Sequence, residues 1–570
     1  CSKLTEIDFG TNSALTKIDS KAFANCELLT EITLPASLTT LGEGYDASVF
    51  DGCIRLEKIN VEQGSKKFIS KDGILYGKGE TEADLYKTLV KVPARVTVAN
   101  GIADLPKTLS GIADYAFAGT EIVTSVTFGG GINGTLAIGK NAFENCQRLT
   151  SVTLPDGLTS IGAYAFRNCV KLTRVDMPNS IASIGDYAFE NCFALAAAEF
   201  ASGNDATRLA IGRGVFSATA IKTLQIPERT NVITKSAFAK MTALTSITLP
   251  SSLTQLDMLF ADWEKKGSPK QVYSILSDTY CSNLSSVTFN GESQLKEIMI
   301  GAFEGLTSLS KFVIPSTVET IKARAFLGSG LENITIPSSV TKMGHQVFEN
   351  CKKLKTVVFE TDNIEGYLDE TVQYDYENMF RNCTSLVSVK LPSALKKLAI
   401  SMFEGCVKLE SLLIPKTVEI IEPSVFMQTN SLKTVTLERF AAEDGADKAG
   451  KISLKTIYYN AFFKSAITEF VFYDNLDGNI NFGNSFIIYG FSQDGTKYKS
   501  TTTRGQTLIF SNCKKMTTIT ISDSIKPSMV TNIIGDLHAL KEIKFGANSE
   551  FVIDAPFVFN KDGKTIVYSY

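Results

Sequence analysis

The sequence predicts a repeat solenoid, and three observations lead to this fold class. The stretch from Leu149 to Cys192 contains one motif twice, since nine positions of the first copy return as the same or a similar residue 23 residues later. A Phe in the same phase recurs along the chain of 570 residues, and nine of the eleven Cys follow such a Phe by three residues. A fixed period of this size is typical of stacked repeats, and the chain is long enough for about 20 of them.

Each part of one repeat has a structural interpretation. Residues 151–154 alternate polar and apolar side chains, which predicts a short strand with one buried face. Pro155 has no N–H to donate, so the strand should end there. Residues 158–161 form a second extended piece, and Gly162 suits a turn. Residues 165–166 are then expected to pack inward in a short helical turn, which makes the repeat a β/α unit.

The Phe and Cys of the motif are predicted to be packing positions. The clearest examples are Phe143, Cys146, Phe166, Cys169, Phe189, Cys192, Phe403 and Cys406. Cys1 and Cys281 share the phase, so all eleven Cys belong to one small apolar position. Stacking would place neighbouring Cys within the Cα separation of about 4.4–6.8 Å that a disulfide requires. Buried free thiols are expected, and disulfides between turns are the alternative.

The whole chain, residues 1–570, is interpreted as a single solenoid with insertions. Residues 62–106 contain the turn signals 71–73 and 77–79 between β-prone runs, which predicts a hairpin insertion. Residues 551–570 resemble that segment and are expected to begin a second hairpin insert. Longer spacings between motif copies predict loop insertions at 261–280, 361–376, 439–452 and 490–506. Such insertions form loops along one side of a solenoid and often carry binding residues.

The complete unit, LxxIxLPxxLxxIGxxAFxxC, contains the LxxLxL core of a leucine-rich repeat. It resembles the BspA-like leucine-rich repeats of bacterial surface proteins over nearly the whole chain. The segment LAAAEF at 195–200 and the region beyond Leu437 depart from the pattern. The resemblance implies a right-handed superhelix, curved like a horseshoe, in which the xxIxL strands line the concave surface. It also implies an extracellular or cell-surface protein used for adhesion or ligand capture.

Composition narrows the function classes. The net charge is −3, so no strongly basic surface is expected for binding nucleic acid or anionic lipid. No apolar run reaches the roughly 18 residues that span a bilayer, so this segment should not insert into a membrane. Cys1 fits the repeat phase. Attachment through a lipid on Cys1, or through regions outside this chain, remains an alternative for surface anchoring.

No constellation of residues indicates catalysis. The two histidines, His345 and His538, are 193 residues apart, about eight solenoid turns, and cannot share a site in a rigid stack. No CxxC, HExxH, Walker loop or nucleophile elbow is present. We therefore expect a non-enzymatic protein with no cofactor and no metal.

The outward positions of the xxIxL strands are the candidate binding surface. Most are Thr or Ser, which is also adequate as plain β-surface. The departures are apolar or basic residues: Val313, Val358, Leu413, Val471, Lys311 and Lys390. If the apolar residues form one column, they make an exposed strip of the kind found at interaction sites. Trp263, in the 261–280 insertion, is a further anchor candidate, although pinning that insertion to the solenoid is its more ordinary role.

These observations leave three functions open. The first is recognition of a protein ligand on a host or microbial surface by a monomeric repeat protein. The second is a structural spacer that presents another domain. The third is a carbohydrate-capture module, which the lack of aromatic residues at the outward strand positions disfavours.

Overall fold

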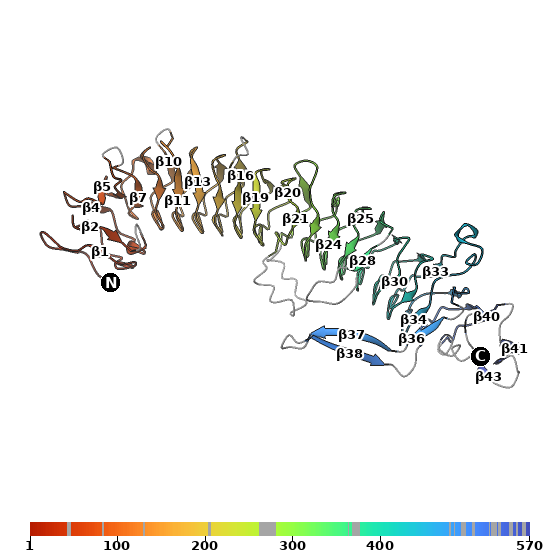
Figure 1. Ribbon diagram of the computed structural model, residues 1–570. Coiled ribbons are helices and arrows are strands. Elements are labelled where there is room, and N and C mark those ends of the chain that lie inside the picture. Colours follow the sequence, from red (N-terminus) through yellow and green to blue (C-terminus); the bar gives the residue numbers. More distant parts are fainter. Residues whose placement is uncertain are drawn as a thin grey trace. The chain divides into compact units, whose positions relative to one another are not determined.

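The computed structural model describes the chain except for a set of short segments. These are residues 43–46, 82–84, 129–130, 203–206, 262–280, 363, 367–376, 478–479, 484, 492–496, 504–507, 524, 526–532, 534–536, 547–550, 555–556, 561–565 and 570. The chain divides into two compact units. Figure 1 labels their strands along the sequence. Unit 1 comprises residues 1–253 and 259–293, and unit 2 comprises 254–258 and 294–570.

Each repeat of unit 1 supplies a first strand, from the LxxLxL segment, and a second strand that follows the Pro. The first strands pair in parallel in four groups: β2 (Glu31–Leu34) with β4 (Lys58–Val61); β8 (Ile102–Asp104), β10 (Ser125–Thr127) and β12 (Ser151–Val152); β14 (Arg174–Met177) with β16 (Ala197–Phe200); and β18 (Thr223–Gln225), β20 (Ser246–Leu249) and β22 (Ser286–Phe289). The second strands, together with the antiparallel strands β5 (Phe68–Lys71) and β6 (Ile74–Gly77), form a nine-stranded sheet. The second strands in it are β7 (Thr88–Lys91), β9 (Gly111–Ile112), β11 (Leu136–Ile138), β13 (Leu158–Ile161), β15 (Ser183–Ile184), β17 (Leu209–Ile211) and β19 (Thr230–Ile233). Strands β1 (Lys17–Ile18) and β3 (Thr40–Leu41) pair separately, and the 3-10 helices are η1 (Ala47–Phe50) and η3 (Ala99–Gly101).

Unit 2 repeats this arrangement. Its first strands are β25 (Asn333–Ile336), β27 (Thr356–Phe359) and β29 (Ser388–Lys390); β31 (Ser411–Ile414) and β33 (Thr434–Leu437); and β35 (Glu469–Val471), β39 (Thr518–Ile521) and β40 (Glu542–Phe545). Its second strands are β21 (Gln255–Leu256), β23 (Glu297–Ile298), β24 (Thr320–Ile321), β26 (Lys342–Met343) and β28 (Glu365–Gly366), and then β30 (Lys397–Leu398), β32 (Ile420–Ile421), β34 (Thr456–Tyr458) and β36 (Asn481–Gly483). A 3-10 helix, η5 (Ala442–Asp444), lies between β33 and β34.

Two antiparallel groups lie near the end of the chain. They are β37 (Ser485–Phe491) with β38 (Lys497–Thr503), and β41 (Phe551–Asp554), β42 (Phe557–Asn560) and β43 (Ile566–Ser569).

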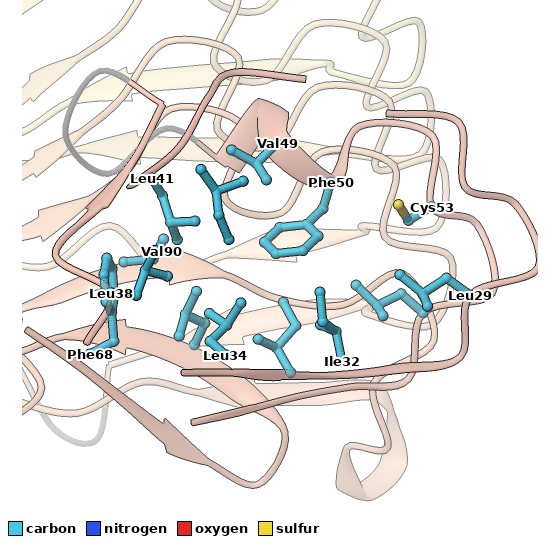
Figure 2. Close-up of a cluster of buried hydrophobic side chains, with 14 of the residues drawn as sticks. Leu29, Ile32, Leu34, Leu38, Leu41, Val49, Phe50, Cys53, Phe68 and Val90 are labelled. Atoms are coloured by element: carbon cyan, nitrogen blue, oxygen red, sulfur yellow. The ribbon is translucent and has the colours of Figure 1, made fainter. Parts of the chain in front are cut away.

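The core is a set of side-chain columns that run from turn to turn. Phe143 and Phe166 stack with ring centroids 4.7 Å apart and planes 4° from parallel. In unit 2, Phe348 and Phe380 stack at 5.7 Å and 1°. Figure 2 shows the first part of this core, where Phe50 packs among Leu, Ile and Val side chains. Complete burial of a Phe side chain stabilises a fold by about 1.5–3 kcal/mol, so the stack is a main source of stability.

The segment that carries each Phe, here called the Phe turn (residues 162–169 in one repeat), differs from the expectation. It is a series of turns and not a helix, because Tyr164 and Asn168 adopt left-handed backbone conformations with φ of 58° and 60°. The N–H groups of Tyr164, Phe166 and Asn168 therefore point to the next repeat, where they donate to carbonyl oxygens at 2.9, 2.7 and 2.9 Å. The prediction of short helical turns is thus wrong in detail. Stacked, non-helical turns connect the repeats.

Strands β5, β6 and β7 form an antiparallel sheet, and β7 also pairs in parallel with β9 as a second strand. No Phe follows β7, and Lys91 replaces part of the Phe turn. Its Nζ donates to the carbonyl oxygens of Tyr115 and Ala118 at 3.1 and 3.2 Å. In a complete repeat the carbonyl at the position of Ala118 accepts a backbone N–H instead. For example, the Asn145 N–H donates to the Arg167 carbonyl oxygen at 2.9 Å. Lys91 is only 3% exposed, and burial lowers the pKa of its ammonium to about 8.

Candidate interaction face

The face formed by the first strands of unit 2 is built rung by rung, with one rung per repeat. Backbone hydrogen bonds fix the order of the rungs: Glu332 N–H donates to Ser310 at 3.1 Å, and Lys355 N–H donates to Glu332 at 2.7 Å. The Val387 N–H continues this series by donating to Lys355 at 2.9 Å. In a second series, the Thr468 N–H donates to Lys433, and the Lys433 N–H donates to Glu410. Within each first strand, alternate residues point inward to the core and outward, as the repeat pattern requires.

One outward position per rung forms what we call the outer column. Its members, in rung order, are Val313, Thr335, Val358, Lys390, Leu413, Thr436, Val471, Thr520 and Lys544. Strand register pairs Thr335 with Val358 and Val358 with Lys390, and it pairs Leu413 with Thr436. The repeats of Lys390 and Leu413 are joined by the stacked rings of Phe380 and Phe403, 5.4 Å apart. All four apolar candidates therefore belong to one column.

The apolar residues of the outer column are exposed but not contiguous. Val313 is 84% exposed, Leu413 57% and Val358 36%, while Val471 is half-buried. A Thr or Lys separates each from the next, so the column alternates apolar and polar side chains. The exposed apolar strip that a single column would make is therefore interrupted by polar rungs.

Basic side chains accompany the outer column. Lys311 lies on the rung of Val313, and Lys390 lies between the rungs of Val358 and Leu413; both are exposed. Lys355 makes an ion pair with Glu332 at 2.8 Å. Lys355, followed by Lys353 and Lys311, holds the pKa of the Glu332 carboxyl below its ordinary value.

The same position in unit 1 is polar on every rung. It contains Thr33, Asn60, Asp104, Thr127, Thr153, Asp176, Glu199, Gln225, Thr248 and Thr288. Several of these side chains bond to neighbouring rungs: Thr248 and Thr288 at 3.1 Å, Thr127 and Asp104 at 2.7 Å. The alternation of apolar side chains is therefore a property of unit 2 and not of the repeat.

The remaining candidates lie elsewhere. Trp263 lies outside the described residues, so its predicted role stays a prediction. His345 lies in a Phe turn, partly buried, and His538 is exposed in another turn. Within the described part of the chain, no group of three or more His, Cys, Asp or Glu side chains is placed to hold a metal ion.

The Cys column has a polar role that sequence reasoning missed. The thiol of Cys169 donates to the carbonyl oxygen of Phe143 in the preceding repeat at 3.1 Å, and Cys192 does the same to Phe166. Each of these carbonyls also accepts the N–H of the Cys in its own repeat. All eleven Cys are free, ten of them buried, and burial raises the pKa of Cys351 to about 11. The recurring Phe-x-x-Cys spacing was the available signal.

Charged side chains on the Phe turns of unit 2 form a second feature not foreseen from the sequence. Arg324 contacts Glu304 at 2.8 Å, and Arg381 lies between Glu349 at 3.7 Å and Glu404 at 3.3 Å. Burial raises the pKa of Glu349, against the opposing effect of Arg381. This ladder links successive turns and is part of the scaffold.

Comparison with known families accounts for the repeats. The model of the BspA type leucine-rich repeat region, in six copies, matches residues 1–72, 102–208, 136–262, 277–370 and 365–478. The chain belongs to the BspA-type leucine-rich repeat family. The leucine-rich repeat solenoid expected from the sequence is thereby confirmed.

Solved structures of related architecture are distant from this BspA-type protein. A leucine-rich repeat protein from Bacteroides ovatus is 19% identical over 94% of this chain and 88% of its own, with a TM-score of 0.42. The pneumococcal vaccine antigen PcpA is 13% identical over 84% of this chain and 98% of its own, with a TM-score of 0.32. A leucine rich cell surface protein from Faecalibacterium prausnitzii is 18% identical over 77% and 87%, with a TM-score of 0.25. At these TM-scores the similarity adds no argument beyond the family.

Two further findings concern curated relatives and membrane-spanning helices. A search of curated proteins finds no match. Over the part of the chain that the structure describes, no helix is long and apolar enough to cross a membrane.

Proposed function

We propose that this BspA-type protein is a non-enzymatic recognition protein that binds a protein ligand through the outer column of unit 2. The observation that carries the proposal is the exposure of Val313, Val358 and Leu413 at strand positions where unit 1 has only polar residues. Apolar side chains at one outward position on three rungs of the same column are the departure from the repeat pattern that supports the proposal. A spacer without a ligand would need no such departure from the Thr and Ser of the other rungs.

A location on the cell surface, with a role in adhesion, is part of the same proposal. Its support is the family, whose repeats occur in bacterial surface proteins. The fold itself does not determine this role, since one scaffold serves many functions. A carbohydrate ligand is disfavoured because the outward positions of the described first strands carry no aromatic ring on which a sugar could stack.

The test uses a random peptide library displayed on phage and selected on the immobilised full chain. Selected peptides are then measured against Val358→Glu/Leu413→Glu and against Thr127→Glu/Thr153→Glu, a matched control in the same column of unit 1. We expect the selection to yield peptides whose affinity for the first variant is at least about tenfold lower than for wild type, a change of about 1.4 kcal/mol. Their affinity for the control variant should equal that for wild type. A selection in which no peptide distinguishes the two variants overturns the proposal.

A further inference from the structure

The chain contains three Asn–Gly steps, and the structure holds them differently. They are Asn100–Gly101, Asn133–Gly134 and Asn290–Gly291. An Asn before Gly is the step most prone to deamidation in peptides, because Gly has no side chain to hinder attack of its own nitrogen on the Asn amide. In a folded chain the rate also depends on whether the side-chain amide and the Gly nitrogen are free to meet. The contacts of the three steps therefore rank their reactivity.

Asn290–Gly291 is the most strongly held of the three. The Asn290 Nδ2 donates to the carbonyl oxygen of Ile226 at 2.9 Å, and the Asn290 Oδ1 accepts from the Gln225 Nε2 at 3.2 Å. The Asn290 N–H also donates to the Leu249 carbonyl oxygen at 3.0 Å. Both ends of the side-chain amide must leave their partners before the Gly291 nitrogen can reach the carbon between them, so the attack is slowed.

At Asn100–Gly101 the glycine is held and not the side chain. The Gly101 N–H donates to the Val98 carbonyl oxygen at 3.4 Å. The Gly101 carbonyl oxygen accepts the Thr124 N–H at 2.8 Å and the Thr124 hydroxyl at 3.2 Å. Gly101 can turn its nitrogen toward the Asn100 side chain only by giving up these bonds, so this step should be slowed as well.

Asn133–Gly134 has neither restraint. Both residues are exposed, and among the described residues no hydrogen bond involves the Asn133 side-chain amide or the Gly134 N–H. The backbone on either side is nevertheless fixed. The Asn133 N–H donates to the Lys107 carbonyl oxygen at 2.9 Å, and the Leu136 N–H donates to Gly157 at 2.9 Å. The two reacting groups are therefore free and open to water within an ordered part of the stack.

We propose that Asn133 is a site of spontaneous deamidation in the folded protein. The Gly134 nitrogen gives up its proton and bonds to the Asn133 Cγ, while the Cγ–Nδ2 bond breaks and ammonia leaves with that proton. The product is a cyclic succinimide. Water then opens the ring: cleavage at the main-chain carbonyl leaves isoaspartate, and cleavage at Cγ leaves aspartate. Water is the only co-reactant, and no atom is oxidised or reduced.

The modification changes both the charge and the main chain. Either product replaces a neutral amide with a carboxylate and so adds one negative charge. Isoaspartate also routes the main chain through the Cβ of residue 133, which lengthens the connection to Gly134 by one atom. The Gly134 carbonyl packs tightly against Gly157, where an added Cβ would lie 2.3 Å from the Gly134 oxygen. The longer connection therefore shifts Gly134 and loosens this contact between neighbouring repeats.

The test follows deamidation of the full chain at each site by peptide mapping and mass spectrometry, in the native state and in urea at the same pH and temperature. Urea supplies the control, because the unfolded chain loses the contacts that distinguish the sites. Native Asn133 should react within about threefold of its rate in urea, whereas Asn290 should be slowed at least about tenfold, a barrier difference of about 1.4 kcal/mol. Asn100 should react more slowly than Asn133 in the native protein. Isoaspartate is identified by its methylation with protein isoaspartate methyltransferase.

Two matched variants connect the reaction to its site. Gln reacts far more slowly than Asn, since its longer side chain must form a larger ring. Isoelectric focusing of the aged wild type should show a more acidic species, which Asn133→Gln should lack and Asn290→Gln should keep. The proposal is overturned if Asn133 is protected as strongly as Asn290, if Asn100 reacts faster than Asn133, or if the acidic species forms at the wild-type rate in Asn133→Gln.

Discussion

Lys91 predicts an unusual dependence of stability on pH. Its ammonium is buried in the core of unit 1, and desolvation lowers its pKa from 10.5 to about 8. Below pH 8 both the folded and the unfolded chain carry the proton, so the folded state bears the full cost of burying the charge. Between pH 8 and 10.5 only the unfolded chain keeps the proton, so the free energy of unfolding rises with pH. At about 1.36 kcal/mol per pKa unit, the total rise is about 3 kcal/mol.

The assay compares wild type with Lys91→Met in urea unfolding, followed by circular dichroism, at several pH values from 7 to 10.5. The difference between the two chains cancels the titration of all other groups. Met also leaves the Ala118 carbonyl without the ammonium, a loss of about 1–3 kcal/mol that does not vary with pH, whereas the Tyr115 carbonyl keeps the N–H of Ala118 at 3.0 Å. We expect the advantage of wild type to grow by about 3 kcal/mol across the range. Lys140→Met, at an exposed position of the same unit, should show no such growth. A constant difference between wild type and Lys91→Met would refute the reasoning.

Three further predictions concern the scaffold and the face. Asn168→Ala and Asn168→Gly both lose the amide hydrogen bonds to Asn145 and Asn191; in urea unfolding Asn168→Ala should be less stable than Asn168→Gly by about 1–2 kcal/mol, because Ala tolerates the left-handed conformation poorly, and an equal loss in both variants would contradict the backbone explanation. A thiol reagent should modify only Cys1 in the native protein and all eleven Cys after denaturation without reductant; fewer than eleven would indicate disulfides. Val358→Glu/Leu413→Glu should change the free energy of unfolding by no more than about 1 kcal/mol, because both side chains face outward; a collapse of the thermal transition would show that they belong to the core.

The repeat fold could be predicted from the sequence because every repeat has the same spacing of apolar positions. Phe166 and Cys169 recur with their neighbours at fixed spacing, and stacking such copies leaves few alternatives to a solenoid. The inward packing of Ala165 and Phe166 predicts a helical turn. This prediction fails because Tyr164 and Asn168 adopt left-handed conformations that direct their N–H groups to the next repeat. Asn at the second of these positions was a weak signal, since Asn tolerates that conformation better than most residues.

Other features depend on structure that the linear motif does not contain. Phe260 stacks on Phe238 with centroids 6.2 Å apart, yet the residues between Phe260 and Cys281 conceal its place in the pattern. Lys91 has no counterpart in the repeat, so only its contacts reveal that an ammonium replaces a backbone N–H. The outward residues can be read from the sequence in order, whereas the register that pairs Val358 with Lys390 and the exposure of Val358 and Leu413 come from the structure.

The bond between Cys281 and Phe238 bears on how such a protein acquires new loops. The Cys281 thiol donates to the Phe238 carbonyl at 2.9 Å, although residues 261–280 lie between Cys281 and the Phe of its own turn. Each turn is therefore held by the turn before it, and continuity of the chain within a turn is not required for that attachment. The step between Phe and Cys is accordingly a permissive insertion point. A foreign peptide grafted there should leave the stack intact, which makes every complete repeat a separate place where new sequence can be added during evolution or by design.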